Sequence, residues 1–338
     1  MAGNFRSALQ AFCVMQWMMT FLFLVLIRAG AVLLLLLLLR TRLWLIPVTY
    51  GGWWLWDWNG PERGPRHWDW LRNWRIWDHF CDYFPITIVR ECPLPPGRSY
   101  LLPCHPTAFP ASEPSALSGG AGPCPGLRPS LAALQGLFRL PLYREYALAA
   151  GLCPVSQRCL DAVLSRDSQA LLIMVGGAAE ALEGTPGCHR VTLSHRRGFV
   201  RLALRHGTPL VPVYVFGEQD TFGVPSLAEG SWLRRLQRGL KGILGFAPCI
   251  FWGRGGLPLL PFRVPLTVVV GTPLEVPRVP RPSANLVAHY HGLYVRELRG
   301  SSRGTKWGAG SPRHPPGHRV TPKSHRDPPK TPDTPGIV

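Results

Sequence analysis

Acidic residues are scarce in this sequence: 19 Asp and Glu stand against 37 Lys and Arg among 338 residues, a formal net charge of +18. Charged residues of both signs make up only 17% of the chain, whereas 46% of it is hydrophobic. The length excludes a disulfide-stabilised miniprotein and leaves room for one large or two small domains. The excess of positive charge favours an anionic partner, such as phospholipid headgroups, nucleic acid or a phosphorylated ligand.

Several site patterns are absent as well. The nine cysteines are scattered, and no CxxC motif or Cys/His pair has the spacing of a zinc site. We therefore predict reduced cysteines, no disulfide framework and no metal site. The sequence also lacks a Walker A loop, GxGxxG, Gly-x-Ser-x-Gly and HExxH. Nucleotide hydrolases, dehydrogenases, serine esterases and zinc peptidases therefore lack their usual sequence support.

Two apolar runs stand near the N-terminus. Residues 13–27 form the first, and the second contains the unbroken stretch Leu33–Leu39. A spanning helix needs about 20 apolar residues, and neither run reaches that length cleanly. We therefore predict a membrane-embedded hairpin over residues 13–56, after a cytosolic segment 1–12. Its helices cover about 13–27 and 31–48, enter and leave on one side, and bend at Gly30.

Two other interpretations of this region remain open. A secretory signal would be cleaved near Ala29-Gly30-Ala31, although Arg28 and the second leucine run argue against it. A buried core helix is the other alternative, and the flanking arginines argue against that.

Tryptophan is concentrated just after the hairpin. Eight of the thirteen tryptophans lie between Trp53 and Trp77, interleaved with arginines. This pattern predicts that residues 57–82 form a belt at a membrane interface. A tryptophan-rich soluble core is the alternative, but it would require partners for many indole N–H groups.

Residues 83–298 have the pattern of a mixed α/β domain. Strands are predicted at Ile86–Val89, Leu171–Val175, Pro209–Phe216 and Pro265–Val270, and helices at Leu131–Phe138, Gln157–Ser165 and Gly198–Arg205. The segment Pro110–Pro129 is predicted to be a loose loop, and Ser231–Phe246 a basic amphipathic helix on a membrane or in water. The basic, proline-rich tail 299–338 is predicted to be disordered. No nucleic-acid recognition module accompanies it, so we predict no nucleic-acid partner.

Three features could carry chemistry. His105 stands at the end of an apolar strand and is a candidate general base, because histidine titrates near neutral pH. Glu180 follows a buried strand and a Gly-Gly turn, which places a carboxylate at the edge where open α/β sheets bind ligands. Arg196, Arg197 and Arg201 open a helix and suit phosphate binding. Each also has a purely structural interpretation: a core histidine, a helix-start carboxylate and a solvated charged face.

Together these segments resemble the type-2 diacylglycerol/monoacylglycerol O-acyltransferase family. The blocks that carry the resemblance are Tyr83–Pro85, Pro125–Pro129, Pro141–Tyr146, Gly151–Ser156, Val175–Glu180, Arg196–Ala203, Val211–Glu218, Phe251–Gly255 and Val269–Pro273. The resemblance implies an endoplasmic-reticulum membrane enzyme with its active site facing the cytosol. It would transfer a fatty acyl group from acyl-CoA, its co-substrate, to a glyceride or a long-chain alcohol. No cofactor is implied, and homo- or hetero-oligomerisation is left open.

The sequence departs from the family at one important place. Where the family has His-Pro-His-Gly, this chain has His105-Pro106-Thr107-Ala108. A threonine hydroxyl does not titrate near neutral pH, so Thr107 cannot replace a histidine base. The expected mechanism therefore uses His105 as base, supported by Glu180, with the three arginines on the CoA phosphates. The alternative is a catalytically inactive membrane protein that binds lipid or acyl-CoA.

Overall fold

The computed structural model describes residues 2–22, 24–105, 126–176, 195–223, 252–256 and 260–304, together with Cys124 and Leu193. Its centre is a seven-stranded sheet with the order β1-β7-β6-β2-β5-β3-β4. The strands are β1 Ile86–Arg90, β2 Tyr100–His105, β3 Arg128–Ala133, β4 Leu152–Pro154, β5 Gln169–Met174, β6 Val213–Phe216 and β7 Leu266–Val270. Neighbouring strands run parallel except β6 and β7, so the predicted mixed sheet is confirmed.

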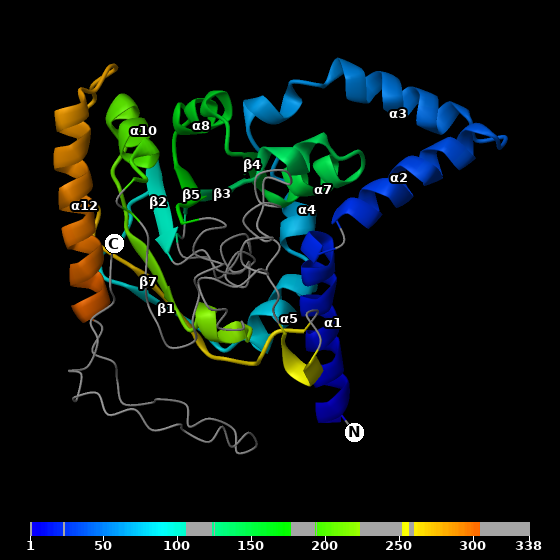
Figure 1. Cartoon of the computed structure of the whole chain (residues 1–338), viewed down its shortest axis with the longest axis horizontal. Helices are drawn as coiled ribbons and strands as arrows, with labels where there is room; N and C mark the ends of the chain where they lie inside the picture. The colour runs from blue at the N-terminus through cyan, green and yellow to red at the C-terminus, as the bar shows by residue number, and fades with distance from the viewer. Residues whose placement is uncertain are drawn as a thin grey trace, which may run out of the picture.

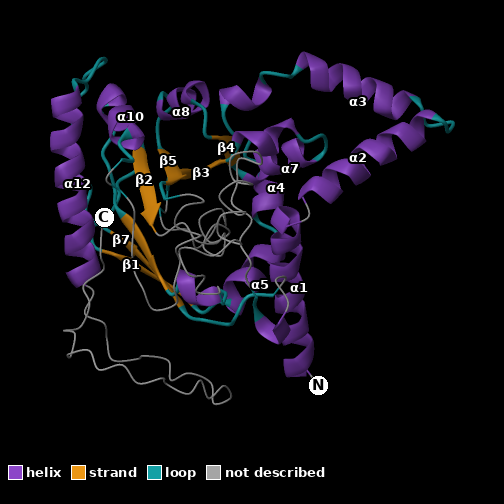
Figure 2. Cartoon of the chain, viewed as in Figure 1, coloured by secondary structure: helices purple, strands orange, loops and turns teal. Residues whose placement is uncertain are grey.

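Helices cover both faces of the sheet (Figures 1 and 2). The α-helices are α1 Ala2–Leu22, α2 Leu24–Leu39, α3 Leu45–Trp56, α4 Asp69–Arg72, α5 Arg75–Tyr83, α7 Tyr143–Ala150, α8 Gln157–Leu164, α10 Gly198–His206 and α12 Ala284–Gly304. The 3₁₀ helices are η1 Gly60–Arg63, η2 Gln135–Arg139, η3 Glu218–Thr221 and η4 Arg254–Gly256. One core lies under α8, α10 and α12, and a second lies under α1, α5 and α7. Successive residues of β2 alternate between these cores, as the period of a strand requires.

The helix predicted at Leu131–Phe138 is wrong. Its first half belongs to β3, where Leu131 and Ala132 pair with Leu172 and Ile173 of β5. Its second half forms the short helix η2. A short apolar run does not distinguish a buried strand from a helix, and here the sheet on both sides of β3 decides the outcome. Part of the segment predicted as the loop Pro110–Pro129 is also strand, because β3 already begins at Arg128.

Helices α2 and α3 form an arm that projects from the α/β domain (Figure 1). The predicted bend at Gly30 is wrong, because α2 runs through Gly30 and ends only at Leu39. Leucine is a strong helix former, and a run of leucines outweighs the cost of about 1 kcal/mol for one glycine. The turn between the two helices lies instead at residues 40–44.

The arm exposes apolar side chains along both helices. Leu33, Leu37 and Leu55 are more than half exposed, and Trp56 is 83% exposed. Within the described residues, however, no helix combines the length and the apolarity needed to cross a bilayer. The membrane hairpin therefore stays a prediction for α2 and α3. Its first predicted helix, over 13–27, is wrong in part, because Val14, Trp17 and Met18 of α1 are buried in the core of the domain. The tryptophans that follow divide into two groups, since Trp68 and Trp70 are exposed while Trp77 is buried and donates to the carbonyl of Leu71 at 2.8 Å.

Candidate functional site

His105 is the last residue of β2, as the sequence predicts, and its side chain is fully buried. Strand β2 lies between β6 and β5, so His105 stands at the carboxyl edge near the middle of the sheet. Its Nε2 atom lies 3.0 Å from the hydroxyl of Tyr294 on α12. The same hydroxyl donates to the carbonyl oxygen of Pro103 at 3.2 Å. A buried polar pair therefore sits where open α/β sheets bind their ligands.

The surroundings of His105 keep its imidazole neutral. Burial alone lowers the pKa of His105 to about 3, so the expectation of a histidine that titrates near neutral pH is wrong for this state of the site. The ring is therefore neutral at physiological pH and has a lone pair on one nitrogen. In this buried position the imidazolium cation is strongly disfavoured, which makes the ring a weak base.

Several predicted residues lie outside the described residues: Glu180, Thr107, Ala108, the amphipathic stretch Ser231–Phe246 and residues 305–338 of the predicted tail. The prediction of disorder is wrong for residues 299–304 of that tail, because α12 continues to Gly304. The strand that leads toward Glu180 is in place, because β5 pairs with β2 and Met174 stands opposite Cys104. The chain therefore leaves β5 at the edge where His105 is located.

The three arginines predicted to bind phosphate surround the start of α10, and all are exposed. Among the described residues, none of their guanidinium groups forms an ion pair. Cations at a helix N-terminus oppose the helix dipole, so their position there is not explained by helix stability. An anion would be held both by the arginines and by the free N–H groups of the first turn.

An aromatic contact connects this helix start to the buried histidine. Phe199, the second residue of α10, meets the ring of Tyr294 edge-on at a centroid distance of 4.9 Å. Tyr294 in turn contacts His105. The start of α10 is therefore linked to His105 through the side chains of Phe199 and Tyr294.

Sequence reasoning missed Tyr294. The signal that could have identified it is the pair His291 and Tyr294, three residues apart and so on one face of an amphipathic helix. Both are buried, and His291 Nε2 lies 3.1 Å from the carbonyl oxygen of Leu193. Polar residues on the buried face of a helix need partners, and here the partners come from the sheet edge and its loops.

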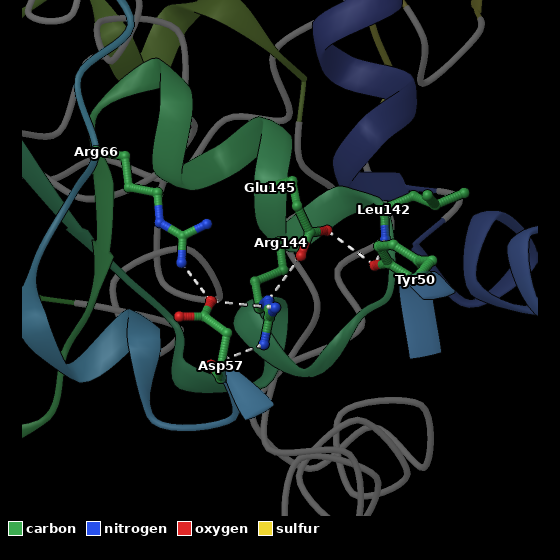
Figure 3. A network of polar contacts seen from close by, with 6 residues as sticks. All are labelled: Tyr50, Asp57, Arg66, Leu142, Arg144 and Glu145. Carbon is green, nitrogen blue, oxygen red and sulfur yellow. Dashed lines mark hydrogen bonds and ion pairs between the residues drawn. The ribbon is translucent and has the colours of Figure 1, made fainter. Parts of the chain in front are cut away.

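A second buried polar network, at the base of the arm, was also missed (Figure 3). Arg144 of α7 is 1% exposed and lies 3.4 Å from Asp57 Oδ2 at the end of α3. It also donates through Nε to Glu145 Oε1 at 2.8 Å. Arg66 forms an ion pair with the same Asp57 carboxylate. The guanidinium carbon of Arg144 stands 5.2 Å from the ring centroid of Trp53, a cation–π contact.

The network extends further along α3. The Tyr50 hydroxyl donates to Glu145 Oε2 at 3.0 Å and accepts the backbone N–H of Leu142 at 2.8 Å. Leu142 adopts a left-handed backbone conformation, with φ of 64°. Such a conformation costs a leucine roughly 1–3 kcal/mol unless its surroundings hold it. The network therefore fixes both the base of the arm and the start of α7.

A cavity of about 150 Å³ opens beside this network. Its walls include Trp54, Trp58, Phe138, Arg139 and Arg144. Of the predicted site residues that the structure describes, His105 and the three arginines of the α10 region do not line it. Within the described residues no cluster of three or more His, Cys, Asp and Glu side chains could hold a metal ion.

Two histidines, the half-buried His67 and the buried His105, should make the stability of the domain depend on pH. The pKa of His67 is lowered to about 4 by burial and by Arg72, Arg128 and Arg166, and that of His105 to about 3. In the unfolded chain the two histidines bind protons below about pH 6.5. In the folded chain they bind them only when the pH falls to their lowered pKa values. Stability is therefore complete above pH 6.5 and is lost as the pH falls toward 4, by up to about 1.4 kcal/mol per pH unit and histidine.

Thermal unfolding at pH 7.5, 6 and 5 checks this prediction. The variant His67→Gln should show a shallower fall in melting temperature than the parent chain, because one of the two histidines no longer titrates. Equal slopes for parent and variant would contradict the role of His67.

Comparison with known proteins adds the following. A profile of the family named diacylglycerol acyltransferase matches residues 36–304. Human 2-acylglycerol O-acyltransferase 3 is 48% identical over 270 residues, which cover 76% of this chain and 79% of the relative. Bovine (Bos taurus) diacylglycerol O-acyltransferase 2 is 41% identical over 308 residues, with 87% and 84% covered. A solved structure, the 1-acyl-sn-glycerophosphate acyltransferase PlsC from Thermotoga maritima, aligns over 89% of this chain and 98% of its own. The two are 12% identical in sequence and superpose with a TM-score of 0.43, a likeness too weak to define the fold.

Proposed function

The chain belongs to the diacylglycerol acyltransferase family, and from that premise we propose that it transfers a fatty acyl group from acyl-CoA to a hydroxyl. The acceptor is a mono- or diacylglycerol or a long-chain alcohol. The observation that carries this proposal is the position of His105, buried at the carboxyl edge of the sheet and linked through Tyr294 and Phe199 to the arginine-rich start of α10.

In the proposed reaction, His105 takes the proton of the acceptor hydroxyl. The hydroxyl oxygen attacks the thioester carbonyl carbon, the C–S bond breaks, and CoA leaves as the thiol with the proton returned to its sulfur. No covalent enzyme intermediate and no metal take part. Arg196, Arg197 and Arg201 hold the CoA phosphates, and Glu180 supports the base electrostatically.

We further propose that the arm of α2 and α3 inserts into the endoplasmic-reticulum membrane, with the α/β domain facing the cytosol. The exposed leucines of α2 and the exposed Trp56 support this, because a contiguous apolar surface of this kind needs a partner. An amphiphilic acceptor dissolved in the bilayer would then reach the domain laterally. Oligomerisation stays an additional proposal.

A second candidate function is acyl-CoA or lipid binding without turnover. Two observations favour it: Thr107 stands where the family resemblance expects a second histidine, and burial lowers the pKa of His105 far below neutrality. In that case the fold retains the ligand sites but lacks an effective base.

The test is acyl transfer by microsomes that contain the chain, after an alkaline carbonate wash that removes peripheral proteins. Labelled oleoyl-CoA is supplied with monoacylglycerol, diacylglycerol or hexadecanol, and the variant Thr107→His is assayed in parallel. Labelled ester formed by the washed parent membranes supports the proposed function. Product from Thr107→His alone supports the second candidate, and loss of the chain in the wash contradicts membrane insertion.

A further inference from the structure

The hydroxyl of Tyr294 has two neighbours but only one proton. It donates to the Pro103 carbonyl oxygen at 3.2 Å and lies 3.0 Å from His105 Nε2. While the hydroxyl donates its proton to the carbonyl oxygen, it can only accept a hydrogen bond from His105. In that arrangement Nε2 carries the hydrogen. A neutral imidazole with hydrogen on Nε2 has its lone pair on Nδ1.

The opposite tautomer fits this site poorly. With hydrogen on Nδ1, the hydroxyl would donate to Nε2, and the Pro103 carbonyl oxygen would lose this hydrogen-bond donor. Nδ1 is buried and has no hydrogen-bond partner among the described residues. It would then be a buried, unpaired N–H donor, and the site would contain one hydrogen bond fewer than with hydrogen on Nε2. Such donors are rarer in folded proteins than under-satisfied acceptors.

We propose that Tyr294 is the positioning residue of this site: it holds the proton of His105 on Nε2 and thereby leaves Nδ1 as the atom that accepts the substrate proton. The proposal rests on the proposed acyl-transfer function for its consequence, although not for its geometry. Tyr294 comes from α12 and acts from the side of the ring away from Nδ1, so it does not touch the reacting atoms.

The consequence for the reaction follows atom by atom. The acceptor O–H gives its proton to Nδ1 while its oxygen forms the new bond to the thioester carbonyl carbon. The imidazolium then carries hydrogen on both nitrogens. Its Nε2–H still donates to the Tyr294 oxygen, and the Tyr294 O–H still donates to the Pro103 carbonyl oxygen. When the C–S bond breaks, Nδ1 returns the proton to the CoA sulfur, and the starting tautomer is restored.

The side chains around Tyr294 and His105 keep the Tyr294 hydroxyl in place. Tyr294 is fully buried, with Phe199 edge-on against its ring. Burial also raises the pKa of Tyr294 well above its usual value, so its hydroxyl keeps its proton. The ring of His105 therefore meets a fixed acceptor on one side.

Nuclear magnetic resonance of the full chain in detergent micelles, with ¹⁵N-labelled histidine, tests the assignment directly. At pH 7.5 we expect an N–H signal at Nε2 of His105 and an unprotonated Nδ1, the signals being identified by their loss in His105→Gln. Tyr294→Phe should shift this histidine toward the other tautomer. A parent chain with hydrogen on Nδ1 would overturn the proposal, and this result does not depend on activity.

Kinetics supply the second readout. Tyr294→Phe should lower kcat by about 10- to 100-fold, because a histidine in the wrong tautomer loses most of its advantage as a base. The KM values for both substrates should not change. In the double variant with His105→Gln, Tyr294→Phe should cause no further loss of kcat, because both substitutions disable the same His105–Tyr294 pair.

Tyr290→Phe is the matched control, the same substitution one turn earlier on α12, at a partly exposed residue whose ring contacts His289. It should leave kcat unchanged. Equal losses for both tyrosines, or additive losses with His105→Gln, would assign Tyr294 a merely structural role. If the parent chain shows the expected tautomer but no turnover, the proposed function fails while the positioning by Tyr294 stands.

Discussion

Replacing His105 with glutamine is expected to lower kcat for acyl transfer by about 10²- to 10⁴-fold, the usual contribution of a general base. Glutamine can keep a hydrogen bond from its amide to the Tyr294 hydroxyl, so the fold should survive the substitution. It cannot accept a proton, and the reaction would depend on water alone. Turnover of labelled oleoyl-CoA at saturating acceptor, in detergent-solubilised chain, measures the loss.

His289→Gln is the control for this change. His289 is an exposed histidine of α12 that contacts the ring of Tyr290. It should retain the activity of the parent chain. Full activity in His105→Gln would remove His105 from the mechanism and leave the base unidentified. Loss of activity together with a large fall in melting temperature would instead assign the effect to folding.

Replacing Arg144 with alanine should lower the free energy of unfolding by about 3–5 kcal/mol, the usual cost of removing one partner from a buried ion pair. Among the described residues, Asp57 would keep its ion pair with Arg66 and Glu145 its hydrogen bond with Tyr50. The cation–π contacts of Arg144 with Trp53 and Trp54 would be lost. For a domain of this size the melting temperature should fall by roughly 6–20 °C. Differential scanning calorimetry in micelles measures the shift.

Arg158→Ala is the matched control, because Arg158 is an exposed arginine of α8. Its substitution should change the free energy of unfolding by less than about 0.5 kcal/mol. Arg144→Lys should fall between the two, since an ammonium group keeps the charge but loses the bidentate geometry and the flat stacking surface. If Arg144→Ala melted at the same temperature as the parent chain, the polar network would not stabilise the contact between the arm and α7.

Local patterns were sufficient for some parts of this molecule. The position of His105 at the end of β2, the strand before Glu180 and the helix after Arg197 all follow from apolar runs and glycine turns. The failures occur where the outcome depends on distant partners. Leu131 is in a strand because β5 and β4 pair with β3 on either side, and its own neighbours in the chain do not indicate this.

The polar partners could not be predicted for the same reason. Tyr294 and His105 are 189 residues apart, and Arg144 and Asp57 are 87 apart. Nothing in the composition of either segment identifies its partner, because a buried tyrosine and a buried arginine can be satisfied in many ways. Only the packing of α12 and α3 against the domain selects these pairs.

The partners in the polar network at the base of the arm lie far apart in the sequence, and this separation sets the order in which they are synthesised. Tyr50 leaves the ribosome 95 residues before Glu145, its hydrogen-bond partner. At about 5–20 residues per second, the arm exists for roughly 5–20 s before α7 has been made. Its leucines must therefore find a bilayer or a chaperone before they have a domain to hold them. If the arm inserts as proposed, it enters the bilayer before Arg144 is synthesised, and the contacts between Arg144 and the base of the arm form afterwards.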